Sequence, residues 1–378
     1  SYYDPNNIPG KMNCEKAGYL KNIFHFDNNY FNISNKEAKN MDVQQRIMLQ
    51  LAEKCIIDSK INYNDFTNTN TGVIVAGGWP QNYQNIFNDK YNVNQYTCTG
   101  SISCIIANRI SYYYNLKGPS FTIDTACSSS GYALHQAING LKNGDMDMCL
   151  VGGINILIPE ISVGFSKAKM LSPDSKIRHL DKNANGYVRS EGASFILIKP
   201  LDKAIKDKNY IYAVINNTSI NQDGKTESIT KPSISQQINN INNITKNIDV
   251  NKLIYYECHG TGTQVGDYVE TKSIGHVLGK KRKEKLLLGS VKPNMGHMEC
   301  NSLFVSLIKV CLMMKKNKLI SNINFEDYND KINFSCGTSI YHLIFNDEDL
   351  KGFNSNFKMI PPLRTKEDQF ALITGIKE

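Results

Sequence analysis

The sequence predicts an α/β fold with a layered, mostly parallel sheet core, and two observations lead to this prediction. Apolar runs alternate with amphipathic stretches from residue 71 to about residue 313, which is the pattern of strands and helices that take turns along a chain. Several of the apolar runs are continuous, as expected of strands buried on both faces. The chain has 378 residues, of which 41% are hydrophobic, so it can bury a core and form about two or three domains.

Each predicted strand is one of these short apolar runs. The strands are expected at residues 72–76, 120–125, 148–152, 193–198, 211–215, 253–257 and 286–289. The best-defined helix starts after Ser128, where apolar residues recur at i, i+3, i+4 and i+7 from Leu134 onward. An Asn-Gly pair at 143–144 closes this helix.

The strand pattern divides the chain into two halves and a tail. A first series of strands ends near the Lys-Pro-Leu-Asp stretch at 199–202, so we expect an N-terminal half at 1–204 and a C-terminal half at 205–345. Isoleucine recurs every third residue in the Asn-rich stretch at 236–247, which predicts a weak surface helix or loop. The polar, irregular residues 346–378 are expected to form a tail or linker.

Composition excludes several classes of protein. The net charge is +8 with only 21% charged residues, and the one dense basic run at 280–285 is interpreted as a solvated loop, so no nucleic-acid partner is expected. No stretch approaches the roughly 18 apolar residues of a membrane span, and the first residues contain no secretory core, so the protein is expected in the cytoplasm. Ten cysteines without paired spacing indicate neither disulfides nor a metal site.

Cys127 is the candidate nucleophile. It lies in the string DTACSSS at 124–130, at the predicted turn between a buried strand and a helix. The free N–H groups and the positive dipole end of a helix favour thiolate, so we expect a pKa below the usual value of about 8.5. Any single cysteine of a reduced protein is more often a small buried hydrophobe, and Cys127 therefore needs partner residues to count as catalytic.

His259 and His297 are the candidate partners. Each follows a predicted strand and is flanked by glycine, in HGTGT at 259–263 and in GSVKPNMGH at 289–297. Ligands meet parallel sheets at the carboxyl ends of strands, and glycines let the backbone approach a ligand closely. One such histidine alone would be interpreted as a polar loop residue. The other histidines lack this frame and are interpreted as structural; they are His25, His135, His179, His276 and His342.

These three motifs together resemble the β-ketoacyl synthase (ketosynthase) domain of type I polyketide synthases and fatty acid synthases. Further strings that are similar to the family occur in the family's order, and the resemblance runs from about residue 2 to residue 334. They are MDVQQR at 41–46, NRIS at 108–111, KGPS at 117–120, MLSPD at 170–174, GYVRSEG at 186–192 and NQDG at 221–224.

The resemblance implies a thiolase-like fold, in which the two related halves of one chain stack in an αβαβα arrangement. It also implies that two copies of the chain form a homodimer. It implies that Cys127 accepts an acyl chain from the phosphopantetheine arm of an acyl carrier protein, with no cofactor bound directly to the enzyme. His259 and His297 would bind the carbonyl of a malonyl-type thioester as it loses carbon dioxide, and Lys292 would support them electrostatically. The expected reaction, a decarboxylative Claisen condensation, forms a carbon–carbon bond in polyketide or fatty acid biosynthesis. The expected partners are acyl carrier protein and acyltransferase domains.

The sequence departs from the family's pattern at three places. The apolar strand that opens the family's domains is missing before Ser1, and the C-terminal end is altered, because only FSCGTSIYH at 334–342 stands where the family has a Gly-rich string. After His297 the residues at 298–302 are larger and more polar than in the family, which predicts crowding of a helix start.

Two alternative functions stay open at this point. A truncated, inactive remnant or dimerisation module would keep the chemical residues without assembling them. A Cys–His hydrolase is less favoured, because it needs a base poised beside the thiol, and two glycine-framed histidines suit carbonyl binding better.

Overall fold

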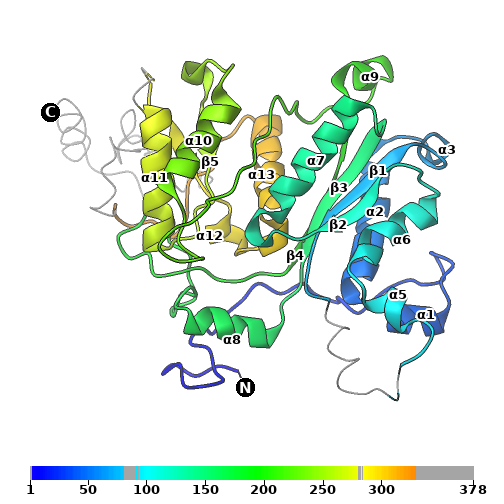
Figure 1. The fold of residues 1–378 in the computed structure, drawn as a ribbon, viewed down its shortest axis with the longest axis horizontal. Helices are drawn as coiled ribbons and strands as arrows, with labels where there is room; N and C mark the ends of the chain where they lie inside the picture. Colours follow the sequence, from blue (N-terminus) through cyan, green and yellow to red (C-terminus); the bar gives the residue numbers. More distant parts are fainter. Residues whose placement is uncertain (1, 81–90, 92, 280–281, 283, 329–378) are drawn as a thin grey trace, which may run out of the picture.

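The computed structural model describes residues 2–80, 91, 93–279, 282 and 284–328, and two sheets organise them (Figure 1). The first sheet has the strand order β2-β1-β3-β4, and the second consists of β5 beside β6. All neighbours are parallel except β3 and β4, which are antiparallel. The strands are β1 (Thr71–Ala76), β2 (Ser120–Ile123), β3 (Met148–Asn155), β4 (Gly192–Ile198), β5 (Tyr255–Glu257) and β6 (Leu287–Gly289).

Helices cover the faces of these sheets. The helices before β3 are α1 (Asn35–Asn40), α2 (Val43–Ser59), α3 (Tyr63–Phe66), α5 (Thr97–Ser101), α6 (Cys104–Tyr114), the short 3₁₀ turn η2 (Ala126–Ser128) and α7 (Ser129–Asn143). The later ones are α8 (Pro159–Lys167), α9 (Leu201–Lys206), α10 (Ile234–Thr245), η3 (Val250–Lys252), α11 (Gln264–Val277), α12 (Lys292–Met295), η5 (Glu299–Asn301) and α13 (Ser302–Lys316).

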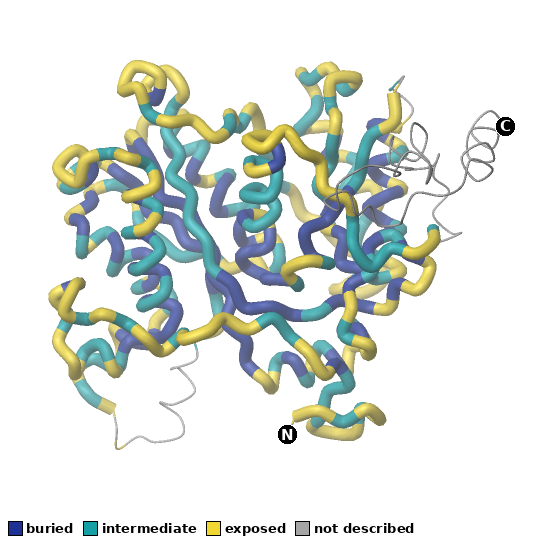
Figure 2. The backbone as a smooth tube through the Cα atoms, turned by 180° about the vertical axis from the view of Figure 1, so that it is seen from behind, coloured by how far each residue is buried: buried dark blue, intermediate teal, exposed yellow. Residues whose placement is uncertain are grey.

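The first sheet is buried on both faces because its side chains alternate between two cores. On one face, Val73 and Val75 of β1 pack against α2 and α6. On the other face, Ile74 and Ala76 pack against α7, and Phe304 of α13 joins them. Figure 2 shows these buried residues as dark blue segments through the interior, with exposed loops at the periphery. Burial on both faces explains why the strands read as continuous apolar runs.

The second sheet completes the layered arrangement. Its own core joins β5 and β6 to α10 and α11, with Ile241 and Ile274 among the buried residues. On its other side α13 approaches β5, where Lys309 forms an ion pair with Glu257 at 2.7 Å. Helices α7 and α13 therefore lie between the two sheets (Figure 1), and the order of layers is helices, sheet, helices, sheet, helices.

Most of the predicted elements are confirmed. Six of the seven predicted strands are present within a few residues of their expected bounds, and α7 ends where predicted, at Gly144 with φ 81°. The stretch expected to be a weak helix or loop forms α10. No helix in the described part of the chain is long and apolar enough to cross a membrane.

The strand predicted at residues 211–215 is not formed. These residues are described as irregular backbone, and no described residue forms a backbone hydrogen bond with them. A β-branched run can form a strand only beside a partner strand, and β-propensity expresses that context more than a preference of the backbone itself. The prediction was wrong because a local pattern cannot supply the partner.

The three expected departures have different outcomes. The first departure concerned the opening strand of the family; in the described part of the chain, β4 pairs with β3 on one side and with no strand on the other. The altered stretch at 334–342 and the tail at 346–378 lie outside the described residues. The crowding expected at 298–302 is absent, because Met298 packs against Gly192 and Asn301 packs against Gly153, two positions without a side chain.

Candidate active site

Cys127 lies in η2, where the chain turns from β2 into α7. Ser129 fixes this turn: its hydroxyl accepts a hydrogen bond from Thr125 N–H at 2.8 Å and donates one to the Ala126 carbonyl at 2.7 Å. Ala126 has φ 53°, in the left-handed region that non-glycine residues rarely adopt. The turn thus places Cys127, which is half-buried, one residue before the N-cap of α7.

The pKa of Cys127 is raised to about 11, against the lowering predicted from its position at a helix start. The largest cause is the loss of water around the thiol, and the second is repulsion between a thiolate and Glu299. Lys292 and Arg189 oppose the increase by attracting a thiolate. The helix-dipole argument was correct about geometry and wrong about the net direction, because it left out burial and a carboxylate from the other half of the chain.

This shift predicts a pH profile for chemical modification. Because only the thiolate reacts, alkylation of Cys127 by iodoacetamide is expected to rise about tenfold per pH unit from pH 7 and to level off only near a pKa of about 11. Mass spectrometry of the peptide that contains Cys127 measures the rate, with an unstructured cysteine peptide as the reference. A plateau near pH 8.5 would contradict the structure and support the original sequence-based expectation.

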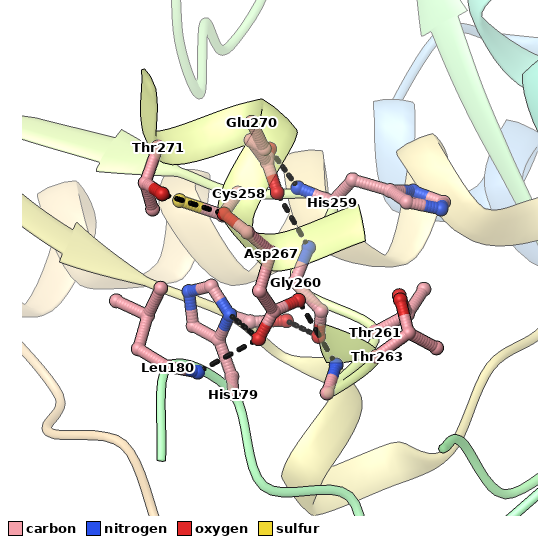
Figure 3. A network of polar contacts seen from close by, with 12 residues as sticks. His179, Leu180, Cys258, His259, Gly260, Thr261, Thr263, Asp267, Glu270 and Thr271 are labelled. Carbon is pink, nitrogen blue, oxygen red and sulfur yellow. Dashed lines mark hydrogen bonds and ion pairs between the residues drawn. The ribbon is translucent and has the colours of Figure 1, made fainter. Parts of the chain in front are cut away.

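Two carboxylates of α11 hold the loop that carries His259 (Figure 3). Glu270 accepts hydrogen bonds from the N–H groups of His259 and Gly260, at 2.7 and 3.0 Å. Asp267 accepts one from Gly262 N–H at 3.1 Å. The His259 ring points away from these carboxylates, so the loop is anchored through its backbone and the imidazole stays available.

His297 is buried and held from both sides by residues 186–190 of the first half. Its N–H donates to the Val188 carbonyl at 2.8 Å, and its carbonyl accepts from Ser190 N–H at 2.9 Å. The ring packs edge to face against Tyr187, with centroids 5.0 Å apart. Glu299 N–H donates to Nδ1 of His297 at 3.0 Å, so the proton of the neutral ring is on Nε2, which makes Nε2 a hydrogen-bond donor.

The two imidazoles lie side by side, with ring centroids 5.3 Å apart and planes at 82°. Burial lowers the pKa of His297 far below its usual value, and Lys292 lowers it further. His259 keeps some exposure to solvent, and the partial loss of water around its ring, with Lys292 as the second cause, lowers its pKa. Both rings are therefore neutral at neutral pH, and a neutral imidazole carries one N–H donor.

Lys292 and the ion pair of Arg189 with Glu299 complete the charges of the site. Lys292 begins α12, is 2% exposed, and has a pKa that burial lowers and that Glu270 partly restores. Arg189 binds both oxygens of Glu299, at 2.5 and 2.9 Å. The turn η2, which carries Cys127, packs against η5, where Glu299 lies. Lys292 lowers the pKa of the thiol and of both imidazoles, so it lies near each of them. The structure thus gathers the predicted residues around Lys292: Cys127, His259 and His297.

Sequence reasoning missed the residues that support these four. Asp267 and Glu270 lie three residues apart at the start of a helix that follows HGTGT, and this spacing is a signal for acidic side chains that cap a loop. His179, interpreted as structural, lies behind the same loop. Among the described residues, no group of three or more His, Cys, Asp or Glu side chains could hold a metal ion.

Comparison with known proteins identifies the class to which this fold and site belong. The family model "Beta-ketoacyl synthase, N-terminal domain" matches residues 1–204, and the model "Beta-ketoacyl synthase, C-terminal domain" matches residues 212–326. The chain belongs to the β-ketoacyl synthase family, and its fold is thiolase-like.

Polyketide synthases are among the similar proteins within that family. The chain is 39% identical over 336 residues to polyketide synthase 37 of Dictyostelium discoideum, and 38% identical over 336 residues to the reducing polyketide synthase FUB1 of Gibberella moniliformis. These matches cover 86% and 88% of this chain but only 11% and 14% of the two relatives. Among solved structures, the ketosynthase from module 6 of the bacillaene synthase of Bacillus subtilis 168 superimposes with a TM-score of 0.81 at 37% identity, covering 88% of this chain and 57% of that one.

Proposed function

We propose that this chain forms carbon–carbon bonds by decarboxylative Claisen condensation between an acyl group on Cys127 and a malonyl-type thioester. The observation that carries the proposal is a pair of neutral imidazoles whose ring centroids lie 5.3 Å apart, with Lys292 acting on both rings and on the thiol of Cys127 from the other half of the chain. A pair of neutral donors suits an oxyanion that develops during the reaction better than it suits removal of a proton from water. This distinguishes a condensing enzyme from a Cys–His hydrolase.

In the first half-reaction, the sulfur of Cys127 attacks the carbonyl carbon of an acyl thioester. The bond to the donor thiol breaks, and the proton of Cys127 leaves with that thiol, so charge is conserved. Because one thioester replaces another, the acyl group stays activated. Lys292 favours the thiolate at the moment of attack, since it is the largest influence that lowers the pKa of Cys127.

In the second half-reaction, the bond between the malonyl carboxylate and its neighbouring carbon breaks and releases carbon dioxide. The electron pair moves into an enolate, whose oxygen accepts hydrogen bonds from His259 and from Nε2–H of His297. The enolate carbon then attacks the acyl carbonyl on Cys127, and the thiolate leaves. A single well-placed oxyanion donor is worth about 10²–10³ in rate, so the two rings supply the main stabilisation.

The finer assignments are also part of the proposal. The substrates would be carried on phosphopantetheine of an acyl carrier protein, with an acyltransferase domain as supplier; the similarity to much longer polyketide synthases supports these two partners. We also propose that the reaction takes place in the cytoplasm. A homodimer is supported by β2, which lies at the edge of the first sheet with no paired strand on its outer side in the described residues.

A two-stage assay tests the function. The full chain is incubated with a short acyl-pantetheine thioester, and intact-mass measurement is expected to find one acyl group, located on the Cys127 peptide. A malonyl-pantetheine thioester is then added, and the β-ketoacyl product is expected with release of the acyl group from the protein. A folded sample whose Cys127 remains unmodified would instead support the inactive remnant, and release of the free acid would support hydrolysis.

A further inference from the structure

The imidazole of His179 faces Asp267 and lies on the other side of the loop from the ring of His259 (Figure 3). It belongs to the first half of the chain, between α8 and β4, and is completely buried. Its Nδ1 lies 3.3 Å from Oδ2 of Asp267 on α11. A carboxylate only accepts hydrogen bonds, so Nδ1 of His179 carries a proton and is the donor.

The same carboxylate is bound to the loop. Oδ1 of Asp267 accepts from Gly262 N–H at 3.1 Å, and Oδ2 also accepts from Leu180 N–H at 2.8 Å. Gly260 faces His179 so closely that a Cβ on it would lie 2.8 Å from Nδ1. His179 thus contacts the loop in two ways, through Asp267 and by direct packing on the backbone next to His259.

The other nitrogen of His179 has no partner. Nε2 is a buried polar atom without a hydrogen bond in the described part of the chain. An unsatisfied buried nitrogen lowers stability, and a hydrocarbon side chain of similar size would avoid that cost. Buried polar atoms without a hydrogen-bond partner are expected at functional sites, where the loss of stability is offset by another role of the residue.

We propose that His179 is a positioning residue for His259. Its Nδ1–H orients the Asp267 carboxylate, the carboxylate holds Gly262 N–H, and this bond fixes the far end of the loop 259–263. Glu270 holds the near end at His259 and Gly260 independently. Loss of His179 should therefore shift the His259 ring without releasing the loop, and Cys127 should be unaffected. This inference rests on the proposed function.

Variants of His179 in the full chain separate positioning from packing. His179→Asn keeps an N–H close to the position of Nδ1, whereas His179→Leu fills the space without a donor. The condensation kcat of the leucine variant is expected to fall by about 10-fold or more, because small misplacements of a catalytic group are costly, and the asparagine variant should recover most of it. Acyl loading on Cys127 should match wild type in both. His276→Leu, at an exposed histidine on α11, the helix that carries Asp267, serves as the matched control.

Each outcome decides the inference. Unchanged condensation in the leucine variant, or equal losses in the asparagine and leucine variants, would overturn it while leaving the proposed function intact. Wild-type protein that loads but never condenses would overturn the proposed function instead. Should the leucine variant fail to fold, His179→Gln replaces it, because glutamine presents its N–H near the position of Nε2; equal activity of the asparagine and glutamine variants would then overturn the inference.

Discussion

A chain with His297→Ala is expected to load an acyl group on Cys127 at the wild-type rate and to lose condensation by about 10²–10³-fold. The reason is that His297 presents Nε2–H to the enolate oxygen, with its tautomer fixed by Glu299 N–H on Nδ1. Loading needs the Cys127 thiol and its turn, which contains no atom of His297. Intact-mass measurement of the loaded protein, followed by quantification of released carbon dioxide and product, measures both steps.

The reciprocal variant is Cys127→Ala, which should carry no acyl group at all. A second control is His297→Gln, which presents an amide N–H near the position of Nε2 and should recover part of the lost condensation. If loading and condensation fall together in His297→Ala, the residue acts by supporting the fold, through its packing on Tyr187, and not as an oxyanion donor.

The spacing of apolar residues along the sequence was sufficient to predict those elements whose residue period follows from burial. The continuous apolar runs of β1 and β3 and the apolar stripe of α7 predicted their elements, because burial on two faces or on one stripe sets the residue period. The run at 211–215 is also apolar and forms no strand, since strand formation depends on a partner that the run itself does not encode.

In the candidate site too, some features were predicted from short motifs, and others depend on residues that are distant in sequence. Cys127, His259 and His297 were found from short motifs; the structure places the two histidine rings side by side, and Lys292 acts on both rings and on Cys127. The pKa of Cys127 was predicted in the wrong direction because burial, its largest cause, and Glu299, its second, both depend on parts of the chain that are distant in sequence. The pair of His179 with Asp267 was missed for the same reason: each residue looks ordinary until the two halves of the chain are packed together.

Replacing Arg189 with leucine is expected to lower the free energy of unfolding by about 3–5 kcal/mol, because it leaves a buried carboxylate without its partner. Arg189 is 4% exposed, binds both oxygens of Glu299, and also donates to Ser162 Oγ at 2.6 Å. Urea unfolding of the full chain measures the change. As a matched control, Lys182→Leu breaks the exposed ion pair with Asp327 and should leave the unfolding midpoint nearly unchanged.

The double variant Arg189→Leu/Glu299→Leu distinguishes stability from function. Removing both charges should restore much of the lost stability, since a buried ion pair is often no better than the hydrophobic pair that replaces it. Glu299 raises the pKa of Cys127 more than Arg189 lowers it, so the double variant should alkylate faster than wild type at pH 8, and Arg189→Leu alone should alkylate more slowly. If the double variant is both stable and more reactive toward iodoacetamide, then the pair serves to set the charge around Cys127 and His297. If stability stays low, the ion pair itself stabilises the fold.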